Sequence, residues 1–378
     1  MDLEKIRHEF PVVEHRIFFD HARVAPLPRR VREKCEAFLK DATENGTANY
    51  PAWMKEVGRV RASFAKFIGA GEDEVAFIKN TSEGISIVAN GIDWQPGDNV
   101  VIPDIEFPAN VYPWMNLKDL GVETRFAKSV KGRVPFEQIR MQVNDRTRVI
   151  SVSSVEANSG FRNDLAQIGA FCKEKGILFC VDAIQSLGVL PMDVKRDHVD
   201  FLAADGHKWL LSVEGLGGFY ISREVLDKIR VVNVGWDSVV DAQNYMDINF
   251  TLRPDARRFE EGTFNTLSIH AFGAALSLFH EVGMDTISER ILHLGDRILD
   301  HLWKRNLKVI SSTEPSERSG AVSFTVKQDL DRFLQFMSYH SVSLTVRDGL
   351  IRLSPHFYNT EDEVDRFFDL LDEFLGQE

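Results

Sequence analysis

The sequence has few cysteines and no excess of positive charge. Its three cysteines, Cys35, Cys172 and Cys180, show no metal-ligand spacing and fit a reduced compartment, so we predict no metal site. The 45 lysines and arginines are outnumbered by 57 aspartates and glutamates, which gives a net charge of -12. Because contacts with nucleic-acid phosphates need concentrated positive charge, this balance argues against a nucleic-acid partner.

The sequence also lacks a long uninterrupted apolar run. Its start, MDLEKIRHEF, carries charges where a signal peptide needs an apolar stretch. Residues 262–280 contain no formal charge, but polar residues such as Asn265 and His270 interrupt them. We therefore predict a loop followed by a buried helix there, and a cytoplasmic protein without a membrane partner.

From residue 83 to about 221, short β-branched segments alternate with amphipathic ones. The pattern predicts strands at 99–103, 148–155 and 177–183 and helices at 111–121 and 165–176. Such alternation is typical of an α/β fold with a mostly parallel sheet covered on both faces. Ligands of these sheets bind beyond the carboxyl ends of the strands, so we expect Ala157, Asp182 and the 205–208 loop to share one crevice.

The pattern changes after about residue 256. The remaining chain predicts long helices at 267–283 and 285–306, short strands near 321–326 and 341–353, and an acidic helix at 361–376. We therefore predict a large domain at residues 16–255 and a smaller α+β domain at residues 256–378. Segment 1–15 is expected to pack with either of them.

Two polar residues follow apolar runs in this alternating region. Asp182, in VDAIQS, closes an apolar strand, where a buried carboxylate needs a cationic partner. The structural alternative is a turn aspartate that bonds to nearby backbone. Lys208, in DGHKW, becomes a nucleophile if burial lowers its pKa, because only the neutral amine attacks a carbonyl. The alternative is a solvated surface lysine.

A third polar segment is KNTSEGIS at residues 79–86. Thr81 or Ser82 is placed to cap a helix that starts near Glu83. Free backbone N–H groups at such a helix start bind phosphate, although a plain capped helix is the commoner meaning.

Taken together, these segments resemble the class V aminotransferase superfamily, which comprises fold-type I enzymes that use pyridoxal phosphate (PLP). This superfamily includes cysteine desulfurases, kynureninase and isopenicillin N epimerase-like proteins. The matching stretches, in order over about residues 15–368, are NTSEG, EFPANVYPW, VEANSGFRNDL, VDAIQSLG, DGHKWL, RFEEGTFNT and IRLSPHFYNTEDEVD. The resemblance implies a large PLP-binding domain, a smaller C-terminal α+β domain, and PLP as the cofactor.

The resemblance also implies a role for each matching residue. Lys208 would form the Schiff base with PLP, and Asp182 would pair with the protonated pyridine nitrogen, which makes these the predicted catalytic residues. The other predicted cofactor contacts are Gln185 and Asn158 near the 3-hydroxyl, Phe107 stacked on the ring, Thr81, Ser82 and His207 at the phosphate, and Gly262 and Thr263 at the partner subunit's phosphate. A homodimer with shared active sites follows from the last pair. Further candidate pocket residues are Glu156, His21, Arg23 and Asn49.

The sequence leaves the roles of two positions undecided. Asp205 stands where many relatives carry serine, and its negative charge conflicts with a direct phosphate contact. The polar residue that relatives carry near the 3-hydroxyl corresponds either to Asn158 or to Ala157.

The resemblance places substrate recognition at two arginines. Arg352, in IRLSPHFYNT, matches the arginine that binds an amino acid's α-carboxylate through a two-pronged contact, and Arg347 is expected to help. A surface arginine on an edge strand is the structural alternative. The expected substrate is thus a small amino acid or amine.

The segment between these two arginines bears on the reaction. Cysteine desulfurases carry a mobile cysteine in this interval, whereas residues 347–352 read RDGLIR. We therefore predict a PLP-dependent enzyme that works through an external aldimine with aminotransferase or epimerase-like chemistry. One alternative is a cysteine desulfurase or C–S lyase that lacks the loop cysteine. The other is a catalytically inactive PLP-binding homologue.

Overall fold

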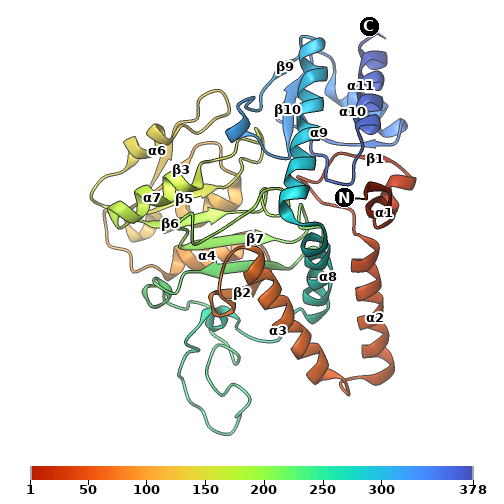
Figure 1. Ribbon diagram of the computed structural model, residues 1–378. Coiled ribbons are helices and arrows are strands. Elements are labelled where there is room, and N and C mark those ends of the chain that lie inside the picture. The colour runs from red at the N-terminus through yellow and green to blue at the C-terminus, as the bar shows by residue number, and fades with distance from the viewer. Residues whose placement is uncertain (1, 377–378) are drawn as a thin grey trace.

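A seven-stranded sheet forms the centre of the protein in the computed structural model, which describes residues 2–376 (Figure 1). Its strands, in spatial order, are β2 (Val75–Ile78), β8 (Gly217–Ile221), β7 (Phe201–Asp205), β6 (Leu178–Asp182), β5 (Thr147–Ser153), β3 (Asn99–Pro103) and β4 (Glu123–Ala127). Strand β8 runs antiparallel to both of its neighbours, and the other neighbouring pairs are parallel. The prediction of a mostly parallel sheet is confirmed.

Two separate apolar cores lie on the two faces of this sheet. In β3, Val101 faces one core while Val100 and Ile102 face the other, which is the two-residue alternation of a strand buried on both sides. Helix α4 (Thr81–Gly91) and Trp114 belong to one core. Among the helices that supply side chains to the other core are α3 (Tyr50–Phe67), α6 (Phe136–Gln142), α7 (Leu165–Lys175) and α8 (Thr266–Val282).

Two predicted helices differ from the structure in detail. The helix expected at 111–121 is a short α-helix, α5 (Tyr112–Met115), followed by a 3-10 turn that ends at Gly121 with a φ of 77°. The helix expected near Glu83 begins two residues earlier, because the side chain of Asn80 accepts a hydrogen bond from the Glu83 amide at 3.0 Å. Asn80 is therefore the cap, and Thr81 and Ser82 lie in the first turn.

Helix α8 packs against α3 and against α2 (Arg29–Asn45) on one side of the molecule (Figure 1). Helix α8 is the buried helix that we expected after the 262–265 loop, and its apolar residues join the core of the large sheet. Among the described residues, no helix combines the length and the apolar character needed to cross a membrane.

A smaller antiparallel sheet lies at the other end of the molecule. Its elements are β12 (Thr345–Arg347), β13 (Leu350–Leu353), β10 (Val322–Thr325) and β9 (Lys308–Val309), packed with α9 (Met284–Lys304), α10 (Leu330–Tyr339) and α11 (Glu361–Leu375) around a third core. Nearby, β1 (Ile17–Phe18) pairs with β11 (Val342–Ser343). The domain boundary at residue 255 stays a prediction, and the packing of α8 on the large sheet favours a later boundary.

The N-terminal segment lies against the C-terminal part of the chain. Helix α1 (Leu3–His8) places Arg7 within 2.9 Å of Glu363 on α11. Phe10 stacks on Tyr358 with ring centres 3.8 Å apart. These contacts hold the segment beside the small sheet.

Candidate active site

A cavity of about 570 Å³ opens at the carboxyl ends of the central strands. Asp182 ends β6 and Asp205 ends β7, so the parallel strands deliver both carboxylates to one edge of the sheet. The predicted site residues that line the cavity are Thr81, Ser82, Phe107, Asp182, Gln185, His207, Lys208, Arg347 and Arg352, together with Arg23 and Asp205.

Lys208 follows β7 on a tight turn, in which the Leu211 amide donates to the Lys208 carbonyl at 3.0 Å. Burial lowers the pKa of its ammonium to about 8, and the nearby arginines act in the same direction, while Asp182 and Asp205 oppose them. At pH 7 about one lysine in ten is then neutral. This lysine is suited to attack a carbonyl group.

Asp182 is almost fully buried, and the Ile184 amide donates to its Oδ1 at 3.0 Å. Burial raises the pKa of this carboxyl to about 6, although the Ile184 hydrogen bond and the charge of Lys208 lower it. No lysine or arginine within residues 2–376 forms a close ion pair with Asp182, and a buried carboxylate in this state favours a cationic ligand group.

Two buried glutamates lie behind Asp182. The backbone amide and the hydroxyl of Ser153 donate to Glu106 at 2.5 and 2.6 Å. Burial raises the pKa of Glu106 to about 8, with Asp182 adding to the shift. Burial and Glu106 likewise hold the pKa of Glu156 well above its usual range. Sequence reasoning missed Glu106, whose only signal is an acidic residue inside the apolar EFP segment.

The end of the cavity at α4 offers hydrogen-bond donors. Thr81 is buried and accepts from the Asp205 amide at 3.1 Å, while Ser82 is exposed to the cavity. The Nδ1 atom of His207 lies 3.1 Å from Oδ1 of Asp205, in a contact that lacks hydrogen-bond geometry. Asp205 therefore lines the cavity next to the donors instead of turning away from it.

The middle of the cavity presents an aromatic face and an amide. The Phe107 ring is 38% exposed, with the Lys208 ammonium 5.6 Å and the Arg347 guanidinium 5.7 Å from its centre. Gln185 is fixed from both sides, because its amide nitrogen donates to the Ala22 carbonyl at 3.0 Å and its oxygen accepts from the Trp209 indole at 2.8 Å. One N–H of Gln185 remains for another partner.

The opposite end of the cavity is rich in arginine. Arg352 is buried and donates to the Ala157 carbonyl at 2.5 Å, while its Nε has no hydrogen-bond partner in the described part of the chain. Burial lowers the pKa of Arg352 to about 10, which leaves it charged at neutral pH. Arg23 and Arg347 lie on the same wall, and Asp20 is the acidic residue that interacts with all three arginines.

Several expected residues lie outside the cavity. Ala157, not Asn158, lines the wall, because the Asn158 side chain turns away and donates to Asp348 at 3.3 Å. His21 bonds to the Ser354 carbonyl and the Tyr358 hydroxyl, Asn49 bonds to Asp41, and Glu156 bonds to Asn163. Gly262 and Thr263 also lie outside this subunit's cavity, and their contact with a partner's cofactor stays a prediction.

The fold and the cavity together define a class of protein. A lysine with a lowered pKa and a buried aspartate meet at the strand ends of a mostly parallel sheet, as predicted for fold-type I enzymes. The model of the family described as aminotransferase class V matches residues 17–367. The chain therefore belongs to this family, which confirms the prediction of a PLP-dependent enzyme.

Curated relatives cover nearly the whole chain. A protein named probable cysteine desulfurase from Methanothermobacter thermautotrophicus is 28% identical over 400 residues, which span 100% of this chain and 99% of the relative. The uncharacterized aminotransferase YcbU from Bacillus subtilis is 28% identical over 369 residues, or 97% of this chain and 96% of the relative.

Solved structures share the fold at low sequence identity. The apo cysteine desulfurase of Thermococcus onnurineus NA1 superposes with a TM-score of 0.91 at 24% identity, covering 99% of this chain and 98% of that one. A mutant of C-DES that holds glycine covalently linked to the PLP cofactor gives a TM-score of 0.89 at 24% identity, covering 96% of this chain and 98% of that one.

The residues in the cavity fit PLP. An exposed aromatic face suits a planar ring, and a lysine with a lowered pKa suits an aldehyde. The first turn of α4, with Thr81 and Ser82, lies beside His207 and provides donors for a phosphate. The buried Asp182 provides a counter-charge for a protonated ring nitrogen.

Proposed function

We propose that the protein is a PLP-dependent lyase that cleaves the C–S bond of a small sulfur-containing amino acid by elimination, without passing sulfur to a protein thiol. The observation that carries this proposal is the connection between β12 and β13. It consists of Asp348 and Gly349 alone, with φ angles of 52° and 77°. Such a two-residue hairpin turn is too short to present a mobile cysteine.

The three cysteines support an elimination that needs no thiol. Burial raises the pKa of Cys172 and raises that of Cys180 to about 12, so neither forms a thiolate near neutral pH. Burial also raises the pKa of Cys35 on α2, and none of the three lines the cavity. Sulfur leaving the substrate would therefore depart as sulfide or a small persulfide.

Each cavity residue takes a defined task in this reaction. When bound, PLP supplies an electron sink that stabilises negative charge at the substrate's Cα atom. Arg352 would hold the α-carboxylate through its two-pronged guanidinium, with Arg347 and Arg23 adding positive charge at the same end. Lys208 would remove the Cα proton, and Asp182 would hold the proton on the ring nitrogen.

The remaining cavity residues would position the cofactor. Thr81, Ser82 and His207 would donate to the phosphate, and Phe107 would stack on the ring. The free N–H of Gln185 would reach the 3-hydroxyl oxygen. Asn158 has no place in this set, because its side chain points to Asp348.

We further propose that the active enzyme is a homodimer. The segment at residues 231–255 extends from the body of the molecule (Figure 1) and exposes large apolar side chains. Their exposed fractions are 43% for Trp236, 65% for Tyr245, 95% for Met246, 91% for Ile248 and 72% for Phe250. Such an apolar surface favours burial against a second copy. Gly262 and Thr263 follow this segment and would reach the partner's phosphate.

Product analysis tests the proposed reaction. Purified protein reconstituted with PLP is incubated with cysteine and with cystine, and pyruvate, ammonia and sulfide or persulfide are quantified. Elimination from cysteine consumes one water and yields pyruvate, ammonia and sulfide in equal amounts. Alanine formed together with protein-bound persulfide would instead identify a desulfurase and contradict the proposal.

A second candidate is the aminotransferase or epimerase-like reaction, and the similarity to YcbU favours it. Transfer of the amino group would give a keto acid that retains the substrate's side chain, and epimerisation would give the enantiomer. An inactive homologue would leave the cofactor's visible spectrum unchanged with every amino acid. A small amino acid as substrate and a cytoplasmic location stay predictions for each of these candidate functions.

A further inference from the structure

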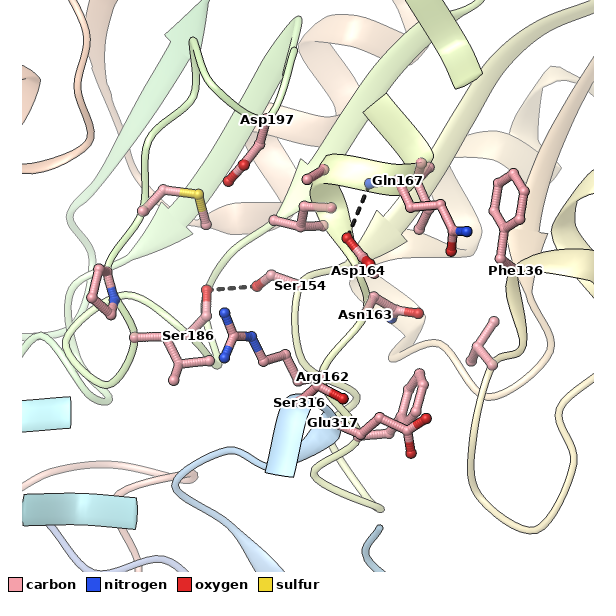
Figure 2. A pocket seen from close by; sticks show the side chains of 18 of the residues that line it. Phe136, Ser154, Arg162, Asn163, Asp164, Gln167, Ser186, Asp197, Ser316 and Glu317 are labelled. Carbon is pink, nitrogen blue, oxygen red and sulfur yellow. Dashed lines mark hydrogen bonds between the residues drawn. The ribbon is translucent and has the colours of Figure 1, made fainter. Parts of the chain in front are cut away.

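A second cavity of about 510 Å³ lies between the large sheet and the 3-10 turn Pro315–Glu317 (Figure 2). The segments after β5 and β6 and the start of α7 form its walls. None of the residues assigned to the active site lines it, although Ser186 in its wall directly follows Gln185 in the sequence.

Arg162 is the unusual side chain of this cavity. Its guanidinium points into the space, toward Ser154 and Ser186 in Figure 2, and forms no hydrogen bond or close ion pair with any residue in the range 2–376. Its backbone amide alone is bonded, to the Glu317 carbonyl at 2.9 Å. Burial lowers the pKa of the guanidinium but leaves it a cation.

The acidic residues of the wall act on this charge without bonding to the guanidinium: Asp164 and Asp197 raise its pKa, and each acidic side chain has another hydrogen-bond partner. Asp164 caps α7 by accepting from the Gln167 amide at 3.0 Å. Asp197 accepts two hydrogen bonds from Arg196 at 2.7 and 2.8 Å. Glu317 pairs with Arg133 and accepts from Ser312. The N–H donors of the Arg162 guanidinium therefore have no acceptor among residues 2–376, and a carboxylate ligand would supply one.

The pair of serines beside Arg162, Ser154 and Ser186, limits which ligand group fits next to it. The Ser154 hydroxyl lies 2.6 Å from that of Ser186 and also reaches the Asp182 carbonyl at 3.1 Å. The Ser186 hydroxyl donates to the Ala183 carbonyl at 3.2 Å. Because the protons of both hydroxyls are directed to protein oxygens, Ser186 faces the cavity as an acceptor. A ligand group next to Ser186 would therefore be a hydrogen-bond donor.

We infer that this cavity binds a small 2-hydroxycarboxylate, with its carboxylate on Arg162 and its hydroxyl donating to Ser186. The planar guanidinium matches a carboxylate through two parallel hydrogen bonds. The site does not depend on the proposed reaction, since no residue assigned to catalysis takes part. Ser154 in the cavity wall nevertheless donates to the backbone carbonyl of Asp182. This hydrogen bond links the cavity to the active-site segment that carries Asp182.

Calorimetric titration of the holoenzyme with sodium lactate tests the inference, with sodium chloride at equal ionic strength as the blank. Lactate has no amino group and cannot react with the cofactor. The Arg162→Gln variant should bind lactate at least about tenfold more weakly, because a charge-assisted contact is lost. Arg162→Lys keeps the positive charge but loses the two parallel hydrogen bonds of the guanidinium. Its affinity for lactate should therefore lie between those of Arg162→Gln and the wild type. Acetate, which lacks the hydroxyl, should bind more weakly than lactate.

Two controls locate the binding. Arg140→Gln removes the same charge from the exposed surface of α6 and should leave lactate affinity unchanged. Arg352→Gln removes the guanidinium proposed to hold the substrate's carboxylate in the other cavity, so lactate binding that remains in this variant belongs to the Arg162 site. Wild-type affinity in Arg162→Gln, loss of binding only in Arg352→Gln, equal affinity for acetate, or no heat from lactate would each overturn the inference.

Chemical modification gives a measurement that needs no variant. Phenylglyoxal reacts with accessible guanidinium groups, and peptide mass spectrometry reports the modified fraction at each arginine. Lactate should protect Arg162 and leave Arg140 reactive. Equal modification of Arg162 with and without lactate would overturn the inference even if Arg162→Gln failed to fold.

Discussion

Nδ1 of His207 lies 3.1 Å from Oδ1 of Asp205 at the end of the cavity that α4 closes. The contact places a carboxylate among the groups that would bind a phosphate dianion. The sequence left open whether Asp205 faces the phosphate site. Asp205 does line the cavity, and the His207 side chain lies next to it.

We expect Asp205→Ser to bind PLP more tightly than the wild type. Removing a negative charge near the phosphate relieves repulsion of about 1 kcal/mol or more, which corresponds to roughly a fivefold to tenfold lower dissociation constant. Fluorescence titration of the apoenzyme with PLP measures this dissociation constant, and Asp205→Asn serves as the isosteric control. Weaker binding in both variants would show that Asp205 acts by orienting His207.

The lowered pKa of Lys208 predicts a pH dependence for cofactor capture. Only the neutral amine attacks the aldehyde, and the pKa of about 8 means that the neutral fraction grows about tenfold per pH unit below pH 8 and levels off above it. The rate at which apoenzyme gains visible absorbance on mixing with PLP should follow the same curve.

Variants at two positions check this assignment. In Asp182→Asn the plateau should begin at lower pH, because the carboxylate of Asp182 raises the pKa of Lys208. In Lys208→Ala the borohydride-stable attachment of PLP should disappear, while Lys79→Ala, which changes an exposed lysine, should retain it. A pH-independent rate in the wild type would contradict the lowered pKa.

The sequence predicted the sheet and the meeting of Asp182 with Lys208 because parallel strands bring their carboxyl ends to one edge. It did not predict which of two adjacent side chains faces the cavity. Ala157 and Asn158 are adjacent, and the hydrogen bonds of this segment involve Arg352 and Asp348, which lie far away in the sequence. Glu106 was missed for a similar reason, since only the folded sheet places it beside Ser153.

We expect Arg352→Gln to raise the KM for an amino-acid substrate by about tenfold to a hundredfold, because one charge-assisted contact with the α-carboxylate is lost. Arg347→Gln should have a smaller effect, since Arg347 is exposed and contacts the Phe107 ring. Steady-state kinetics measures both changes. The dissociation constant of PLP should stay unchanged in each variant, and a parallel loss of PLP would instead indicate a damaged cavity.

The apolar segment 231–255 predicts how the dimer can be disrupted. The double substitution Met246→Glu with Ile248→Glu introduces two charges at side chains that are 95% and 91% exposed in the monomer, so it should weaken association without unfolding the chain. Analytical ultracentrifugation should show a shift from dimer to monomer. Met141→Glu, at an exposed position on α6, is the matched control and should stay dimeric. A monomeric wild type would contradict the proposal of shared active sites.

The elimination proposed for this enzyme makes Cys35 dispensable. Cys35 is the cysteine that is not fully buried, and burial together with Glu36 raises the pKa of its thiol, so it is a poor sulfur acceptor. Sulfide release from cysteine by Cys35→Ser should therefore stay within about twofold of the wild type, since the substitution changes one atom of a partly buried side chain. The methylene blue assay for sulfide measures it, with Cys172→Ala as a control for removal of a buried thiol. Loss of sulfide release in Cys35→Ser alone, with the cofactor spectrum intact, would mean that the thiol accepts sulfur and that the enzyme is a desulfurase of unusual design.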